Sequence, residues 1–129
     1  FLASAHNSLS QRVYVALTEL GHEVSVEVVD SSAAIEAAVA RHTFELIVCP
    51  MLKSIIPESV FGKHRCLIVH PGPRGDRGPS SLDWAIELDM AEWGVTVLEA
   101  TAEKKRSKVV ATYIGGRCVA MLSGTIDLT

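Results

Sequence analysis

A histidine at the end of an apolar segment is the first residue of this sequence whose type and position suggest chemistry. His70 follows the apolar residues 66–69 and is followed at once by Pro71 and Gly72, so its ring is expected to project at the edge of a sheet. Imidazole takes or gives a proton near neutral pH, which makes His70 a candidate general acid or base. The alternative is a strand-end histidine that hydrogen-bonds to backbone.

The segment after this histidine, residues 71–79, is rich in glycine and proline and carries Arg74 and Arg77. Glycines allow backbone N–H groups to approach a ligand closely, and arginines pair with carboxylates or phosphates. A positive environment would also favour the thiolate form of an acceptor thiol. The alternative is a structural turn in which the arginines pair with Asp76 and Asp83.

The elements that would position this loop alternate between strand and helix patterns. Apolar residues recur at helical spacing over residues 9–20, with Asn7 or Ser8 as a cap and Gly21 as a stop. Three more helices are expected over residues 32–42, 57–64 and 81–90, the first capped within residues 30–32. Strand patterns occupy residues 22–29, 44–51, 66–69 and 94–98, and residues 1–5 resemble the end of a further strand.

This alternation predicts an α/β fold with a Rossmann-like, mostly parallel sheet, helices on both faces and right-handed crossovers. The 129 residues fit one domain, and the missing initiator Met suggests a piece of a longer protein, truncated at both ends. Residues 109–114 and 118–122 are expected to form a closing hairpin around Gly115 and Gly116.

Ligands bind beyond the carboxyl ends of strands in open parallel sheets, where residues 4–8, 50–57 and 70–81 would meet. The first of these segments has no G-x-G-x-x-G pattern, so a dinucleotide site loses its main support. A Rossmann-like sheet by itself implies no function.

Composition excludes several other classes of function. Hydrophobic residues make up 48% of the chain and the net charge is −3, which argues against a nucleic-acid partner. No apolar run approaches the ~20 residues of a membrane span, and the cations Lys104, Lys105, Arg106 and Lys108 fit a solvated turn. The three cysteines lack metal-ligand spacing, so no metal is expected, and they fit buried thiols in a reducing cytoplasm: Cys49, Cys66 and Cys118.

The segment HPGPRGDRGPSSLDWAI at residues 70–86 resembles a pattern of 10-formyltetrahydrofolate-dependent formyltransferases, N-x-H-x-S-L-L-P-x-x-R-G-x-x-P-x-x-W-A-I, with one residue fewer between His and Trp. CPMLKSIIP at residues 49–57 resembles the stretch that lies along the folate, and WGVTVL at 93–98 the family's G-V-T strand. Together with SAHNSLSQR at 4–12, these segments are most similar to the amino-terminal domain of the HypX/HoxX hydrogenase maturation factors. The resemblance covers roughly residues 1–100, and residues 101–129 form a divergent tail.

The resemblance implies transfer of a formyl group from 10-formyltetrahydrofolate to an acceptor, coenzyme A in HypX-like proteins. A crotonase-like domain elsewhere in such proteins then releases carbon monoxide for nickel–iron hydrogenase. By the same resemblance His70 is the catalytic residue, stabilising the oxyanion and moving protons. The residues implied to contact the reduced folate lie in two loops: Pro50, Met51, Leu52, Ile55, Ile56, Pro57, Gly72, Arg77 and Gly78.

The sequence departs from the family pattern at both expected partners of the histidine. The family's Asn lies two residues before the His, where this chain has Ile68, and Asn7 is a substitute only if it is not a helix cap. The family's Asp falls within residues 99–107, where Lys105 stands near its place and Glu103 is the nearest carboxylate. Three hypotheses therefore stay open: an active formyltransferase domain, an inactive or truncated folate-binding module, and a nucleotide- or effector-binding Rossmann-like domain without a folate.

Overall fold

A computed structural model of the chain describes residues 1–76, 81–102 and 108–116, the last segment by its backbone alone. The first part alternates strand and helix in the order β1 (Leu2–Ala3), α1 (Ser8–Glu19), β2 (Glu27–Val28), α2 (Ser32–Arg41), β3 (Ile47–Cys49), α3 (Glu58–Phe61) and β4 (Cys66–His70). Three elements follow: α4 (Ser81–Glu87), β5 (Glu92–Glu99) and β6 (Lys108–Gly116). The α/β alternation predicted from the sequence is confirmed.

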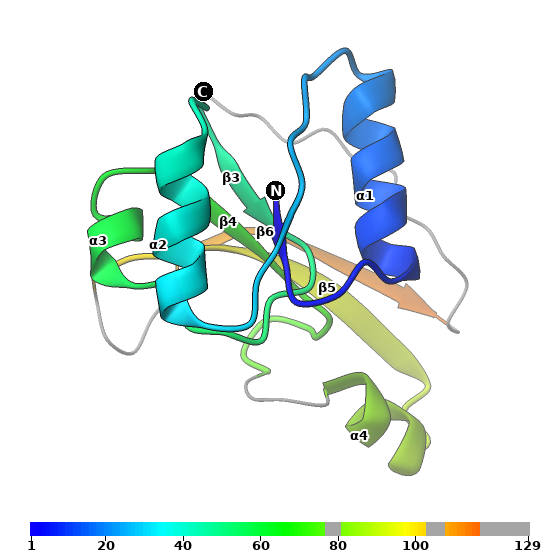
Figure 1. Ribbon diagram of the computed structural model, residues 1–129. Coiled ribbons are helices and arrows are strands. Elements are labelled where there is room, and N and C mark those ends of the chain that lie inside the picture. Colours follow the sequence, from blue (N-terminus) through cyan, green and yellow to red (C-terminus); the bar gives the residue numbers. More distant parts are fainter. Residues whose placement is uncertain (77–80, 103–107, 117–129) are drawn as a thin grey trace.

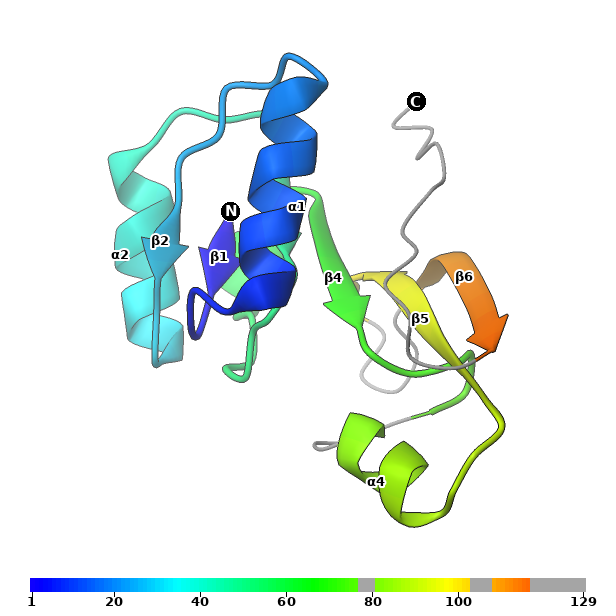
Figure 2. The same ribbon diagram turned by 90° about the vertical axis from the view of Figure 1, so that its right-hand side faces the viewer.

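The strands form two sheets that meet at a narrow seam. β1 pairs in parallel with β2, and a second sheet has the order β3-β4-β5-β6. A parallel bridge between Ala3 and Met51 joins β1 to the end of β3. The strands therefore follow one another across the molecule from β2 through β1 and β3 to β6. Figure 2 shows β2 and β1 on one side of the molecule and β4, β5 and β6 on the other.

Helices cover both faces of the parallel strands, with α1 on one face and α2 and α3 on the other (Figure 1). The chain passes from β1 outward to β2 and then crosses back to β3 on the other side of β1. Right-handed crossovers in opposite directions place their helices on opposite faces. The point of reversal lies between β1 and β3, which is where open α/β sheets bind ligands.

The main core lies between the strands and α2 and α3. Ile35 of α2 is fully buried, and burial of such a side chain contributes about 1.5–3 kcal/mol. Its cluster takes residues from the strands β1, β3 and β4, from the residue that follows β2, from α2 and α3 and from the loop between β3 and α3: Leu2, Val29, Ile35, Ala38, Ile47, Cys49, Ile56, Val60 and Cys66. Ile68 packs against this cluster, so the face of β4 that carries Cys66, Ile68 and His70 is the face that α2 and α3 cover.

The caps and stops predicted for the first two helices are confirmed. Asn7 precedes α1, where its Oδ1 accepts a hydrogen bond from the N–H of Ser10 at 3.0 Å. Ser31 caps α2 in the same way through Ala34 N–H at 3.2 Å. After α1, Gly21 has a positive φ of 88° and the next residue donates to a carbonyl of the last turn, which is a Schellman ending.

The carboxyl-terminal half departs from a fully parallel arrangement. β5 runs antiparallel to β4, with His70 opposite Thr96, and β6 runs antiparallel to β5. The reason is the path of α4, which projects beyond the sheet edge instead of crossing back over a face (Figure 1). A strand that follows such an excursion re-enters the sheet at the end where the preceding strand left it, and therefore runs in the opposite direction.

The predicted hairpin turn at Gly115 and Gly116 is wrong. Both glycines lie within β6, opposite Trp93 and Glu92 of β5, so residues 109–114 continue through them as one strand. The second predicted hairpin strand, residues 118–122, lies outside the described residues, as does the cation cluster at 104–106.

Candidate functional site

Three loops follow the carboxyl ends of β1, β3 and β4, and two of them are joined by hydrogen bonds. The N–H of Ser4 donates to the carbonyl of Met51 at 2.6 Å, and the N–H of Lys53 donates to Ser4 Oγ at 2.8 Å. Extension of the β3–β4 register, in which Cys49 lies opposite Ile68, places Met51 across from His70. The structure thus places segments 4–8, 50–57 and 70–76 at one edge of the molecule, as the sequence predicted.

Hydrogen bonds within residues 5–10 hold the loop after β1. Ser10 is fully buried, and its hydroxyl lies 3.1 Å from the carbonyl of Ala5 and 3.0 Å from the carbonyl of Asn7. Asn7 Oδ1 is engaged by the Ser10 N–H. Asn7 is therefore a helix cap, the role that its position before residues 9–20 indicated.

The residues of segment 50–57 that were expected to contact a folate differ in what they present. Pro50 is fully buried and Ile56 is 6% exposed, so both side chains belong to the interior. Ile55 is 82% exposed, and its carbonyl accepts a hydrogen bond from Ser32 Oγ at 2.8 Å. The remaining three are partly exposed: Met51, Leu52 and Pro57. Any ligand along this segment would meet Ile55 and these residues rather than Pro50 or Ile56.

His70 has a carboxylate partner that the sequence did not identify. Its Nε2 lies 2.7 Å from Oδ2 of Asp76, and the two side chains are 16% and 23% exposed. The sequence analysis had found no recognisable acidic partner for His70. The structure supplies one, because the chain turns back on itself between the two residues. Arg74 is exposed on the same turn, whereas Arg77 and Gly78 lie outside the described residues.

Three hydrogen bonds from later elements hold the loop after β4. The carbonyl of Pro71 accepts from Ser81 Oγ and from Trp93 Nε1, both at 2.9 Å. The carbonyl of Gly72 accepts from Thr96 Oγ1 at 2.8 Å, in a buried position. The start of α4 and strand β5 therefore fix the backbone on which His70 and Asp76 stand.

Of the family-like triplet Trp84-Ala85-Ile86 on α4, only Ala85 is buried. Trp84 is 56% exposed and Ile86 is 66% exposed, and the neighbouring Leu82 and Leu88 are exposed as well. Within the described residues, α4 thus contributes to the site mainly through Ser81, whose side chain is 4% exposed and bound to the loop.

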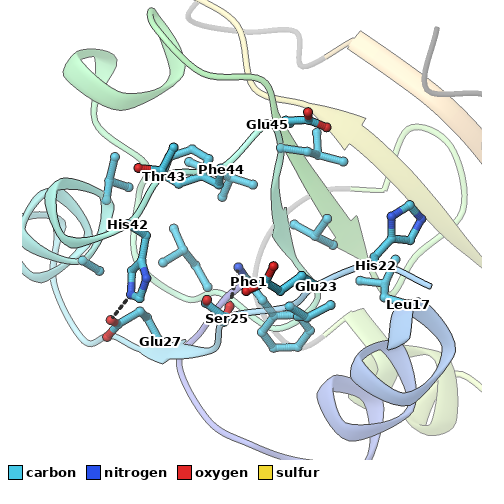
Figure 3. Close-up of a pocket in the computed structure, with 17 residues that line it drawn as sticks. Phe1, Leu17, His22, Glu23, Ser25, Glu27, His42, Thr43, Phe44 and Glu45 are labelled. Carbon is cyan, nitrogen blue, oxygen red and sulfur yellow. Dashed lines mark hydrogen bonds and ion pairs between the residues drawn. The ribbon is translucent and has the colours of Figure 1, made fainter. Parts of the chain in front are cut away.

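A separate hollow of about 490 Å³ opens at the opposite edge of the sheet (Figure 3). Phe1, Phe44 and the carboxylates of Glu23 and Glu27 are among the residues that line it. His42 points to Glu27 across 2.7 Å, and Arg41 pairs with the same carboxylate at 2.8 Å. The hydrogen bonds from Arg41 and then from His42 lower the pKa of Glu27. The hollow lies at the amino ends of β1 and β3, away from His70.

Two further results bear on the class of site. Among the residues that the structure describes, no group of three His, Cys, Asp or Glu side chains is arranged to hold a metal ion. None of the helices described is long and apolar enough to cross a membrane. Cys49 and Cys66 are buried free thiols, as expected, and Cys118 lies outside the described residues.

Comparison with known proteins shows what this chain is similar to. No protein-family model matches the chain. The hydrogenase maturation factor HoxX of Bradyrhizobium diazoefficiens is 52% identical over 102 residues, which are 79% of this chain and 18% of HoxX. The structure of HypX from Aquifex aeolicus in complex with tetrahydrofolic acid matches 90% of this chain with 46% identity and a TM-score of 0.83. Over most of its length the chain is similar to part of the HypX/HoxX proteins.

The HypX/HoxX resemblance expected from the sequence is thereby confirmed. The chain spans about a fifth of the length of these relatives, 18% of HoxX and 21% of HypX. Methionyl-tRNA formyltransferase from Clostridium thermocellum has the same fold, with a TM-score of 0.64 at 14% identity over 89% of this chain. That likeness shows the Rossmann-like formyltransferase fold alone.

Proposed function

We propose that this domain binds a reduced folate along its carboxyl edge and moves a formyl group from 10-formyltetrahydrofolate to an acceptor, with His70 as the catalytic residue. The observation that carries the proposal is the position of His70. Its side chain is 16% exposed at the carboxyl end of β4, and its ring contacts the carboxylate of Asp76. The similarity to HypX, which has been solved with tetrahydrofolic acid, supports the folate.

The proposed folate contacts come from both loops. Exposed Ile55 and partly exposed Met51, Leu52 and Pro57 offer apolar surface to a pterin or its linker. Pro50 and Ile56 would act by shaping the backbone from beneath, because their side chains are buried. Gly72, Arg77 and Gly78 complete the proposed set on the loop after β4.

The chemistry asked of His70 is a proton transfer coupled to acyl transfer. The acceptor forms a bond to the formyl carbon, the bond from that carbon to N10 breaks, and the acceptor's proton ends on N10. An imidazole at the reacting carbon can take the first proton and deliver the second. Stabilisation of the developing oxyanion supplies much of the rate enhancement in such reactions.

Coenzyme A is the acceptor that we propose, by resemblance to HypX-like proteins. Arg74, exposed beside the loop, and Arg77 would favour the thiolate of such an acceptor. In the longer protein we propose a crotonase-like domain that converts the product to carbon monoxide for nickel–iron hydrogenase. The buried free thiols Cys49 and Cys66 accord with a cytoplasmic location, which is also proposed.

One observation favours a second candidate, a folate-binding module without turnover. Ile68 stands where formyltransferases carry an Asn, and it packs against the core cluster. An isoleucine cannot donate a hydrogen bond to an oxyanion. If nothing else in the chain replaces that donor, the domain would bind a folate and leave the formyl group in place.

Calorimetric titration with tetrahydrofolate and a turnover assay with 10-formyltetrahydrofolate and coenzyme A separate these candidates. We expect His70→Ala to bind folate within a few-fold of the unaltered chain and to lose about 100-fold in kcat. His22→Ala is the matched control, because His22 is exposed at the opposite edge.

Equal turnover by His70→Ala would remove His70 from the mechanism. Folate binding without turnover by the unaltered chain would establish the second candidate. Binding of a nucleotide with no binding of folate would overturn both.

A further inference from the structure

The pairing of His70 with Asp76 depends on a loop built for close approach. The N–H of Gly72 donates to the carbonyl of His70 at 2.9 Å, so the chain reverses directly after β4. A Cβ on Gly72 would lie 2.7 Å from His70 Nε2 and closer still to Asp76 Oδ2. Real side-chain carbons do not make such contacts, so only glycine at this position leaves room for the pair.

A second turn brings Asp76 back to the ring. The N–H of Asp76 donates to the carbonyl of Pro73 at 3.0 Å, and Gly75 between them has a φ of +95°. A positive φ at the third position is the mark of a type II turn, which favours glycine there. Both glycines thus allow the contact between His70 and Asp76. Gly72 leaves space for the two side chains, and Gly75 adopts the backbone conformation that the turn requires.

With Asp76 ionised, the contact selects which ring nitrogen of His70 carries the hydrogen. An ionised carboxylate only accepts hydrogen bonds, so Nε2 must donate to Asp76. In neutral imidazole the other nitrogen then holds the lone pair. In that tautomer, Nδ1 is the ring atom able to receive a proton.

We propose that Asp76 is the positioning residue of His70: it holds the ring in the Nε2–H tautomer, so that Nδ1 is the atom that exchanges protons with the acceptor and the folate. This inference rests on the proposed function and adds a residue to it. In the formyltransferase pattern that this sequence resembles, the carboxylate follows the G-V-T strand. Here it lies six residues after the histidine, in the same loop.

The charge of Asp76 would act twice in the reaction. It orients the ring before reaction, and it stabilises the imidazolium that forms when Nδ1 takes the proton. Once that proton passes to N10, the ring returns to the same tautomer, so no further rearrangement is needed before the next turnover. A structural role alone would hold the loop without fixing the nitrogen that reacts.

The test uses ring-nitrogen NMR on the ¹⁵N-histidine-labelled chain without folate, followed by kinetics. In the unaltered chain we expect His70, assigned with His70→Gln, to show the Nε2–H pattern when neutral. In Asp76→Asn we expect a mixture of tautomers, a fall in kcat of about 100-fold and folate affinity within a few-fold. Asp76→Glu, which restores the charge, should recover part of kcat, and Asp83→Asn, on the exposed face of α4, should change neither measurement.

An Nδ1–H tautomer in the unaltered chain would overturn the inference, as would an Asp76→Asn variant with unaltered tautomer and kcat. Circular dichroism and folate affinity identify a variant that fails to fold, in which case Asp76→Glu carries the kinetic comparison. If the Nε2–H tautomer depends on Asp76 but the unaltered chain has no turnover, the pairing stands and the proposed function falls.

Discussion

The indole Nε1 of Trp93 donates a hydrogen bond to the carbonyl of Pro71 across 2.9 Å, and this contact ties β5 to the loop that follows β4. Ser81 Oγ meets the same carbonyl at 2.9 Å. The backbone between His70 and Gly72 is thus held from β5 and from the start of α4 at a single oxygen atom.

Replacement of Trp93 by Phe should loosen this loop without emptying the space that the ring fills. We expect Trp93→Phe to lower the free energy of unfolding by about 1 kcal/mol, the usual net value of one hydrogen bond, and to lower kcat more than folate affinity. Urea denaturation and the turnover assay measure both. Trp84→Phe is the control, since Trp84 is 56% exposed; equal effects of the two substitutions would contradict the assigned contact.

The two glycines of the loop should respond differently to substitution. Gly72→Ala forces the His70–Asp76 pair apart, because the new Cβ would stand 2.7 Å from His70 Nε2, and we expect at least about a 10-fold loss of kcat. Gly75 has open space around it but a φ of +95°, so Gly75→Asn should be tolerated and Gly75→Val should cost about 1–2 kcal/mol of stability. Thermal melts and turnover distinguish the two cases. A Gly72→Ala variant with normal turnover would show that the pair is not needed.

Substitution of Asn7 distinguishes a helix-capping role of this residue from a role in catalysis. As the cap of α1 it should contribute about 1 kcal/mol, so Asn7→Ala should lower Tm by several degrees, on the order of 4 °C, and Asn7→Ser should retain most of the stability. Folate turnover per folded molecule should be unchanged in both. A loss of kcat at unchanged Tm would instead assign Asn7 the oxyanion-stabilising role that Ile68 cannot perform.

The buried thiols should react slowly. Desolvation raises the pKa of Cys49 to about 12 and that of Cys66 to about 11, so both stay protonated at neutral pH. In a Cys118→Ser background we expect labelling by a thiol reagent at pH 8 to be about 100-fold slower in the folded than in the urea-unfolded chain. Rapid labelling of either thiol before unfolding would contradict its burial.

The same shifts set a direction for stability at alkaline pH. Because the folded state holds these thiol protons more tightly than the unfolded state, the unfolded chain releases protons first as pH rises from about 9 towards 12. The free energy of unfolding should therefore fall through this window. Urea midpoints at pH 8 and pH 10 measure the change, and Cys49→Ala should reduce it.

Local signals predicted the first half of the fold well. The Asn7 and Ser31 caps and the Gly21 stop depend on side-chain or backbone geometry within a few residues, which the sequence displays directly. The position of His70 at a strand end followed from the apolar residues 66–69 for the same reason. Burial of Pro50 and Ile56 was not foreseen, because a motif stretch does not reveal which of its side chains face inward.

Long-range geometry was the harder part. Alternating elements do not reveal the direction in which a strand re-enters the sheet, so the antiparallel pairing of β5 and β6 and the strand position of Gly115 and Gly116 were missed. Asp76 was missed as the partner of His70 because the contact depends on two consecutive reversals. A glycine four residues before an aspartate and another directly before it, after a strand-end histidine, was the signal available.

The joint between the two sheets consists of the Ala3–Met51 bridge and the adjacent bond from Ser4 N–H to Met51. Because so few backbone hydrogen bonds join the two sheets here, their separation at this joint requires the least free energy. Local opening of native proteins takes place at such positions. We expect hydrogen exchange of the Ser4 and Lys53 amides to precede that of the β4 and β5 amides. Opening of the native state would then be concentrated beside the loops that follow β1 and β3, where a ligand bound to both loops would oppose separation of the two sheets.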